Sequence, residues 1–163
     1  MAMRNLSSTI SKLAAGGATA LVMALAMIKP FEGIEHKPYY DVVGVLTVCY
    51  GHTGGDIIKD KLYSQSECEA LLKKDLAKVK KQIDPMITVA LPETTKAALY
   101  SFTYNVGVGA FSRSTLLKLL NSGDLLGACG ELKRWVYAGG KKWKGLITRR
   151  QIEEEVCRIL ELP

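Results

Sequence analysis

The strongest hydrophobic feature of the chain is an uncharged run near its N-terminus, residues 13–28, with the sequence LAAGGATALVMALAMI. Arg4 and Lys12 precede this run, and Lys29 and Pro30 close it. Basic residues before an apolar run are typical of an export signal, and they predict a cytoplasmic N-terminus with everything after Lys29 exported. As one helix the run would be about 24 Å long, which is short of the roughly 30 Å hydrocarbon core of a bilayer unless the flanking lysines reach the interface.

The composition of this run predicts a weak membrane anchor. It contains Gly16, Gly17, Thr19 and six alanines, which gain far less than leucine or phenylalanine on entering lipid. We therefore expect the segment to be able to leave the membrane. Two other interpretations stay open. One is a cleaved signal peptide with residues 24–26 as the cleavage site, and the other is an ordinary buried helix of a soluble protein.

Beyond the run, the pattern predicts one small α+β domain that is mainly helical. Valine, leucine, threonine and tyrosine cluster around Gly44, which indicates a hairpin over residues 39–51. Ser64 and Glu67 form a capping box before an apolar stripe that Pro85 stops, so a helix is expected over residues 64–83. Further helices are predicted over residues 93–104, 114–120, 125–135 and 148–160, the last with a capping box of Thr148 and Gln151.

No repeat and no long linker divides this part of the chain, so two units are predicted: an N-terminal segment, 1–30, and a domain, 31–163. The element order predicts a small β-hairpin lobe, a connecting helix and a helical C-terminal lobe. A cleft between two such lobes is where a polymer could bind.

The charge balance predicts an anionic partner. The chain has 22 lysines and arginines against 16 aspartates and glutamates, a net charge of +6, which suits an acidic membrane surface, an acidic wall polymer or nucleic acid. Nucleic acid is not expected, because no basic cluster is interleaved with stacking aromatic residues. His36 and His52 lack the spacing of metal-binding motifs, so neither a metal nor another cofactor is predicted.

The four cysteines are Cys49, Cys68, Cys129 and Cys157. They are spread along the chain rather than grouped at metal-ligand spacing. In a reducing cytosol they would be small buried apolar residues, whereas export would favour disulfides. Four cysteines allow three pairings. We favour Cys49 with Cys68 and Cys129 with Cys157, since each pair joins neighbouring elements of one predicted lobe.

Two carboxylates and a hydroxyl follow the apolar run: Glu32, Asp41 and Thr47. Glycoside cleavage needs one carboxyl group that donates a proton to the leaving oxygen and a second that stays ionised to activate water or stabilise positive charge. Glu32 is the better donor, because burial at the exit of the apolar run would favour its neutral form, whereas Asp41 borders a polar hairpin. Glu35, one helical turn from Glu32, is the alternative acid. The pair alone is weak evidence, since many such residues are simply solvated.

The fuller pattern is Glu-Gly, eight residues between Glu32 and Asp41, five between Asp41 and Thr47, and then Gly51-His52. With this pattern the sequence resembles the phage-type lysozymes of glycoside hydrolase family 24. The resemblance runs from Phe31 to Cys157. It includes Tyr104-Asn105-Val106-Gly107, Phe111, Trp135, Gly145-Leu146, Arg149-Arg150 and Glu154. With its alanine- and glycine-rich N-terminus, the chain is similar to the signal-anchor-release endolysins of lambdoid phages.

The resemblance implies a monomeric muramidase with a lysozyme-like fold, which cleaves the β-1,4 bond between N-acetylmuramic acid and N-acetylglucosamine in peptidoglycan and lyses the host. Glu32 would be the general acid, Asp41 the carboxylate that activates water or stabilises charge, and Thr47 a hydroxyl that positions the water. It also implies substrate contacts by Tyr104 and Ser114.

Further roles follow from the resemblance with less support from the residues themselves. Arg149 would be a basic partner of the catalytic glutamate, although an exposed arginine at a helix start is an equal alternative. His52 would lie behind the site as a hydrogen-bonded hairpin residue, and the role of Thr53 is doubtful. Trp135 and Trp143 could line the path of the sugar, but core packing is the favoured assignment for Trp135.

The position of Glu32 suggests how anchoring could regulate the enzyme. Three residues separate Glu32 from Ile28, so the acid can hardly reach a finished cleft while Ile28 lies in lipid. The hypothesis is that a form tethered to the inner membrane is inactive, and that release to the periplasm lets the segment dock and the Glu32 helix form. The anchor contains no cysteine, which argues against control by thiol exchange. The rival function is a non-enzymatic membrane-active or wall-binding protein.

Overall fold

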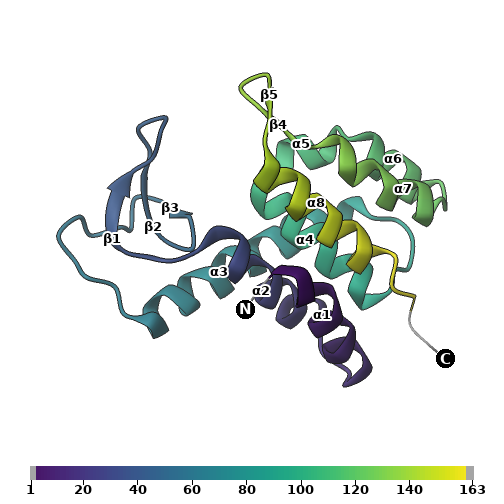
Figure 1. The fold of residues 1–163 in the computed structure, drawn as a ribbon, viewed down its shortest axis with the longest axis horizontal. Coiled ribbons are helices and arrows are strands. Elements are labelled where there is room, and N and C mark those ends of the chain that lie inside the picture. Colours follow the sequence, from purple (N-terminus) through teal and green to yellow (C-terminus); the bar gives the residue numbers. More distant parts are fainter. Residues whose placement is uncertain (1–2, 161–163) are drawn as a thin grey trace.

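The computed structural model describes residues 3–160, apart from the side chain of Arg4, so residues 1, 2 and 161–163 of the two predicted units lie outside it. The chain forms a small β lobe and a larger helical lobe, joined by the long helix α3 (Figure 1). The elements are η1 (Met3–Asn5), α1 (Leu6–Ala15), α2 (Ala20–Glu32), β1 (Glu35–Tyr40), β2 (Leu46–Cys49), β3 (His52–Thr53), α3 (Gln65–Ile83), η2 (Asp84–Met86), α4 (Glu93–Val106), α5 (Val108–Ser112), α6 (Thr115–Asn121), α7 (Leu125–Glu131), η3 (Leu132–Arg134), β4 (Tyr137–Ala138), β5 (Lys141–Lys142) and α8 (Lys144–Cys157). The predicted fold class, mainly helical α+β with a small hairpin lobe, is confirmed.

The β lobe is a three-stranded antiparallel sheet in the order β1-β2-β3. Tyr40 pairs with Leu46, and Gly44 supplies the left-handed backbone, at φ 82°, that the tip of the hairpin requires. The predicted hairpin is therefore present, but β1 begins at Glu35, earlier than expected, and includes Pro38. A proline is tolerated there because β1 is an edge strand and loses no hydrogen bond on its open side.

Helix α3 connects the lobes and matches the prediction closely. The Ser64 hydroxyl accepts from the Glu67 N–H, and the Glu67 carboxylate accepts from the Ser64 N–H, which is the capping box seen in the sequence. Its apolar stripe, ending at Ile83, is buried. The centre of the helical lobe is α4, whose residues 94, 95 and 97–103 are all buried between neighbouring helices, with α2 and α8 packed against it.

The N-terminal apolar run corrects the expectation of one sixteen-residue helix. It is divided into α1 and α2, because the chain turns at Gly17 with φ 81° and Thr19 caps the next helix by accepting from the N–H of Val22. Helix α2 continues through Pro30 to Glu32, past the Lys29 and Pro30 that close the uncharged run, so the boundary expected after residue 30 falls inside α2. Within residues 3–160, no helix is long and apolar enough to cross a bilayer.

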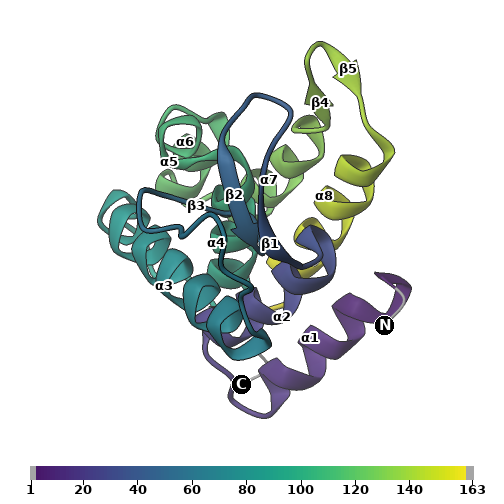
Figure 2. The ribbon, with the colours of Figure 1, turned by 90° about the vertical axis from the view of Figure 1, so that its left-hand side faces the viewer.

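Both N-terminal helices pack on the rest of the domain. Figure 2 shows α1 lying along the lower edge of the molecule, beside α2. Leu6 and Ile10 of α1 are buried, and α1 contacts α2, α4 and α8. In α2, Met23, Met27 and Ile28 are fully buried in the core cluster. The apolar run therefore supplies part of the hydrophobic core.

The C-terminal half departs from the predictions at both ends of α8 and in two elements that were not predicted. Helix α8 begins at Lys144, so Thr148 is an interior residue whose hydroxyl donates to the Lys144 carbonyl oxygen, and the expected capping box at Thr148 is wrong. The helix ends at Cys157, before the predicted residue 160. A short hairpin, β4–β5, and the one-turn helix α5 were not predicted. The hairpin projects from the helical lobe on the same side as the β1–β2 hairpin (Figure 1).

Candidate active site

Glu32 lies at the C-terminal end of α2 and forms an ion pair with Arg149 of α8. Nη1 of Arg149 donates to Oε1 of Glu32 over 2.7 Å, although the residues are 117 positions apart. Gly33 ends the helix in a left-handed conformation, at φ 67°. The Arg149 side chain is 6% exposed and the Glu32 side chain 25%, so solvent reaches the pair from the glutamate side. Arg149 is thus a buried partner of Glu32, and not a solvated residue at a helix start.

Behind Arg149 lies a buried polar network that the sequence analysis missed. The Glu153 carboxylate, 0% exposed, accepts from Nε of Arg149 over 3.4 Å and from Nη1 of Arg150 over 2.5 Å. The Ser101 hydroxyl donates to Glu153 over 2.6 Å, and the Ser101 carbonyl accepts from Nη2 of Arg149 over 2.9 Å. Arg150 also donates to the Asn105 side-chain oxygen. The sequence did contain a signal for these ion pairs: Glu153 lies four residues after Arg149 and three after Arg150, the spacing at which helical side chains meet.

Tyr104 of α4 joins the helical lobe to the β lobe beside Glu32. Its hydroxyl donates to the Tyr50 carbonyl oxygen over 2.5 Å. A Cβ added to Gly51 would lie 3.5 Å from Oε2 of Glu32 and 3.9 Å from the Tyr104 hydroxyl oxygen, so the turn after β2 lies against the carboxylate. Burial raises the pKa of Tyr104, and the negative charges of Asp75 and Glu32 raise it further, which keeps the hydroxyl a hydrogen-bond donor.

Asp41 follows β1 and holds the tip of the hairpin. Its Oδ1 accepts from the backbone N–H groups of Val43 and Val45, over 2.9 and 2.8 Å. Such bonds fix the orientation of a carboxylate. On the neighbouring strand, the Thr47 side chain is buried, and its hydroxyl donates to the Val45 carbonyl oxygen over 2.9 Å. The catalytic roles of Glu32, Asp41 and Thr47 stay predictions.

His52 is a buried residue of β3 that ties the sheet to α3. Its Nδ1 lies 2.8 Å from Oδ2 of Asp75, and its Nε2 lies 2.9 Å from Oδ1 of Asp56. Burial lowers the pKa of His52, but the hydrogen bonds with Asp56 and Asp75 outweigh that effect, and the pKa is raised overall. The two aspartates were not predicted: Asp56 lies four residues after His52 but outside a helix, and Asp75 is 23 positions away. The histidine therefore stabilises the β lobe behind the turn that contacts Glu32.

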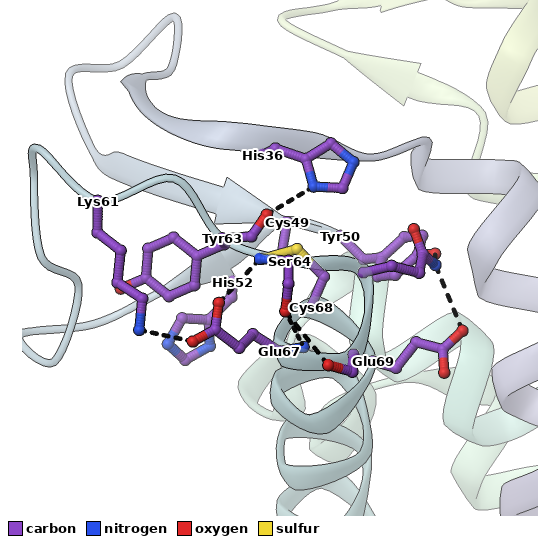
Figure 3. The surroundings of a disulfide bond; sticks show 12 residues. His36, Cys49, Tyr50, His52, Lys61, Tyr63, Ser64, Glu67, Cys68 and Glu69 are labelled. Carbon is purple, nitrogen blue, oxygen red and sulfur yellow. Dashed lines mark hydrogen bonds and ion pairs between the residues drawn. A yellow bond between two sulfur atoms is a disulfide. The ribbon is translucent and has the colours of Figure 1, made fainter.

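The structure contains both of the favoured disulfides. Cys49–Cys68 joins the end of β2 to the first turns of α3, and Figure 3 shows it among the side chains that fasten the sheet to this helix. Gln65 Nε2 donates to the Tyr50 hydroxyl over 2.9 Å, next to this bridge. Cys129–Cys157 joins α7 to the end of α8 in the helical lobe. The first bridge thus holds the strand that leads directly into the Tyr50–Gly51 turn.

Three other residues were considered from the sequence, and two of them, Ser114 and Trp135, make contacts that stabilise the fold. Ser114 is 4% exposed and caps α6, with its hydroxyl donating to the Phe111 carbonyl oxygen and accepting from the Leu117 N–H. A substrate contact by Ser114 stays a prediction. Trp135 packs edge-on against Phe102, with 5.3 Å between ring centroids, as the core assignment requires. Thr53 is exposed at the end of the sheet, and no contact of its side chain decides its role.

A pocket of about 400 Å³ opens beside the Glu32–Arg149 pair. Its lining residues are Met3, Phe31, Glu32, Asn105, Ala138, Trp143, Gly145, Leu146 and Arg149. Five parts of the chain therefore meet around the Glu32 carboxylate: the N-terminal turn, α2, α4, the β4–β5 hairpin and α8. Among residues 3–160, no group of three or more histidine, cysteine, aspartate or glutamate side chains is arranged to hold a metal ion.

Comparisons with known proteins agree with this fold. The phage lysozyme family model matches residues 29–153. The chain is 55% identical over 157 residues to the SAR-endolysin of Bacteriophage PS119, covering 93% of each chain, and 52% identical over 157 residues to that of Enterobacteria phage P21, covering 94% of this chain and 95% of the relative. The muramidase domain of SpmX from Asticaccaulis excentricus has a TM-score of 0.77 at 26% identity, covering 84% of this chain and 95% of that domain.

The two-lobed fold and the match across the site-bearing residues define a glycoside hydrolase of the lysozyme class. The chain belongs to the phage lysozyme family.

Proposed function

We propose that this chain is an endolysin that hydrolyses the β-1,4 bond between N-acetylmuramic acid and N-acetylglucosamine in bacterial peptidoglycan. In this proposal it is first held inactive in the inner membrane by its N-terminal segment and then released into the periplasm. The similarity to SAR-endolysins over nearly the whole chain, N-terminal segment included, supports both parts of the proposal.

Glu32 is the proton donor to the glycosidic oxygen. In the free enzyme, the Arg149 guanidinium pairs with the Glu32 carboxylate over 2.7 Å. To act as the donor, Glu32 has to leave this pair and carry a proton when the glycan strand is bound. Asp41, oriented by two backbone N–H groups, acts as the base that activates the attacking water, and the Thr47 hydroxyl orients that water.

One observation carries the regulatory part: Glu32 belongs to the same helix as the apolar run. Met23, Met27 and Ile28 of that run are 0% exposed in the core, and the next turn of α2 ends at Glu32. These side chains cannot lie in lipid and in the protein core at once. A membrane-embedded run therefore leaves the domain without α2, and without α2 the acid has no fixed position against Arg149 and Gly51.

Docking of the segment is stabilised by the burial of these apolar side chains. Fully burying a leucine, methionine or isoleucine contributes roughly 1.5–3 kcal/mol. The broken geometry at Gly16–Gly17 lets the segment pack as two shorter helices against α4 and α8. The same glycines weaken its affinity for lipid. One feature of the sequence thus favours both release and docking.

The test of the enzymatic proposal is mass analysis of purified cell-wall sacculi after digestion. Hydrolysis as proposed releases fragments with new reducing N-acetylmuramic ends, and anhydro ends would instead identify a transglycosylase. Glu32→Gln should abolish the release. Glu35→Gln is the matched control, since Glu35 is exposed at the start of β1, and it should cleave at nearly the wild-type rate. A Glu32→Gln variant that still releases reducing muramic ends would overturn Glu32 as the acid, and a wild type that releases no new ends would favour the non-enzymatic alternative.

A further inference from the structure

The β4–β5 hairpin brings an aromatic ring to the pocket beside Glu32. The hairpin projects from the helical lobe immediately before α8 (Figures 1 and 2). Trp143, the residue between β5 and α8, lines the same pocket as Glu32 and Arg149. Trp143 is 51% exposed, so it is not a core residue. The half-exposed ring therefore presents apolar surface at the edge of the pocket that contains Glu32.

The backbone and the indole edge of Trp143 are both fixed. The indole Nε1 donates to the Ala138 carbonyl oxygen over 3.0 Å, and the Trp143 N–H donates to the Val136 carbonyl oxygen over 3.0 Å. The Lys141 Nζ lies 5.4 Å from the ring centroid. The ring is therefore held by bonds to the hairpin itself, and ordering it on binding a ligand costs little conformational entropy.

The rest of the pocket has the mixed chemistry that a sugar ring requires. Phe31 and Trp143 supply aromatic surface, and Glu32, Arg149 and Asn105 supply polar groups. The Asn105 side-chain oxygen already accepts from Arg150, which leaves its NH₂ group turned to donate elsewhere. Aromatic rings pack well against the C–H faces of pyranose rings, while hydroxyl and N-acetyl groups need hydrogen-bond partners at the edge.

We infer that Trp143 is a substrate-binding residue, which stacks on a sugar ring of the glycan strand next to the bond that Glu32 protonates. The inference rests on the proposed function and extends it to a subsite formed by the β4–β5 hairpin. Trp143 does not take part in bond cleavage. Its contribution is affinity for the sugar strand, so its loss should raise KM and leave kcat nearly unchanged.

The first test measures binding without turnover, in Glu32→Gln protein, with glycan strands from which an amidase has removed the peptide branches. Trp143 and Trp135 are the two tryptophans of the chain. Binding should change the tryptophan emission, and Trp143→Phe should remove that change while Trp135 still emits. By calorimetry, Trp143→Ala should weaken binding about tenfold, the size of one stacking contact, and Trp143→Phe should weaken it less.

Tyr137→Ala is the matched control, since Tyr137 lies on the same hairpin and is 62% exposed but does not line the pocket. It should leave the dissociation constant unchanged. An unchanged dissociation constant in Trp143→Ala, or an equal loss in Tyr137→Ala, would overturn the inference. The inference also fails if Trp143→Ala weakens binding only to strands that carry peptides, because the ring would then contact peptide.

The second test separates this inference from the proposed function. With Glu32 intact, Trp143→Ala should raise KM on sacculi about tenfold, with kcat within about twofold of the wild type. If the wild type releases reducing muramic ends and Trp143→Ala has the same KM, the subsite fails while the muramidase proposal stands. If the wild type releases none, the proposed function itself fails.

Discussion

The ion pair between Arg149 and Glu32 joins the middle of the last helix to the end of the helix made from the N-terminal apolar run. Nη1 of Arg149 and Oε1 of Glu32 are 2.7 Å apart, and Arg149 is held from behind by Glu153 and the Ser101 carbonyl group. The carboxylate is thus positioned by a side chain whose own geometry is fixed. The candidate acid has a defined place only when α2 and α8 both pack on α4.

Arg149→Met should destabilise the folded protein strongly. Glu153 would stay buried with one of its two cationic partners gone, so the free energy of unfolding in urea should fall by about 3 kcal/mol. Arg158→Met on the same helix is the control, because its pair with Glu154 is largely exposed and should be worth less than about 1 kcal/mol. Equal losses in the two variants would show that the buried network is not what stabilises this region.

His52 makes the stability of the β lobe depend on pH. Its pKa is raised in the folded protein, above an ordinary value of 6.5. The stabilisation is therefore fully present below about pH 6.5 and is lost as the pH rises through the folded-state pKa. The difference in unfolding free energy between the wild type and His52→Gln should shrink from pH 6 to pH 9. A difference that grows over this range would mean that His52 is held in its neutral form.

The two disulfides should affect activity differently. In the chain-entropy model, removing either one lowers the unfolding free energy by about 3 kcal/mol, since their sequence separations of 19 and 28 residues are similar. Cys49 and Cys68 hold the strand that leads to the Tyr50–Gly51 turn beside Glu32. The double serine variant at Cys49 and Cys68 should therefore lose activity at a temperature where it is still folded, as judged by circular dichroism.

The matched variant replaces both cysteines of the Cys129–Cys157 bridge by serine. This bridge lies in the helical lobe, between α7 and the end of α8, so the variant should melt earlier but keep its activity while folded. The same loss of activity in both folded variants would contradict a specific role for the first bridge.

Much of the fold follows from local sequence signals. The capping box of Ser64 and Glu67 fixes the start of α3, because its side chains bond neighbouring backbone N–H groups. Gly44 fixes the hairpin tip, because its own backbone adopts a positive φ. The apolar run is different. Its composition fits both a membrane helix and core helices. Gly17 and the Thr19 cap mark where the helix breaks, but the partners on α4 and α8 decide that the run packs in the core here. No periodicity in the run itself contains that information.

The candidate site shows the same division. Glu32, Asp41 and Thr47 could be named from their spacing, and the place of Arg149 followed from the family resemblance. The spacing of Glu153 from Arg149 and Arg150 was a local signal that was missed. The contacts of Asp75 with His52 and of Ser101 with Glu153 could not be foreseen, because they join distant segments. The early start of α8 was missed because Trp143, a residue without a capping side chain, precedes it.

The paired glycines allow lipid affinity and docking to be separated. Gly16 has φ −82°, and a Cβ there would lie 3.5 Å from its nearest neighbour, so Gly16→Leu fits the docked structure. It makes the run more apolar and should keep more protein in the membrane fraction and delay lysis. Gly17 has φ 81°, so Gly17→Leu should also strain the docked form and destabilise the released enzyme. Unchanged release and lysis timing in Gly16→Leu would rule out the weak-anchor explanation.

The central claim is that the apolar run either lies in lipid or completes the active site, and never does both. The most direct measurement is the number of reducing muramic ends released per molecule of enzyme, compared between right-side-out membrane vesicles carrying the tethered chain and the same chain after release. We predict no detectable cleavage by the tethered chain and full activity after release. Equal rates for the two forms would contradict the claim, since Glu32 would then work without α2 packed in the core.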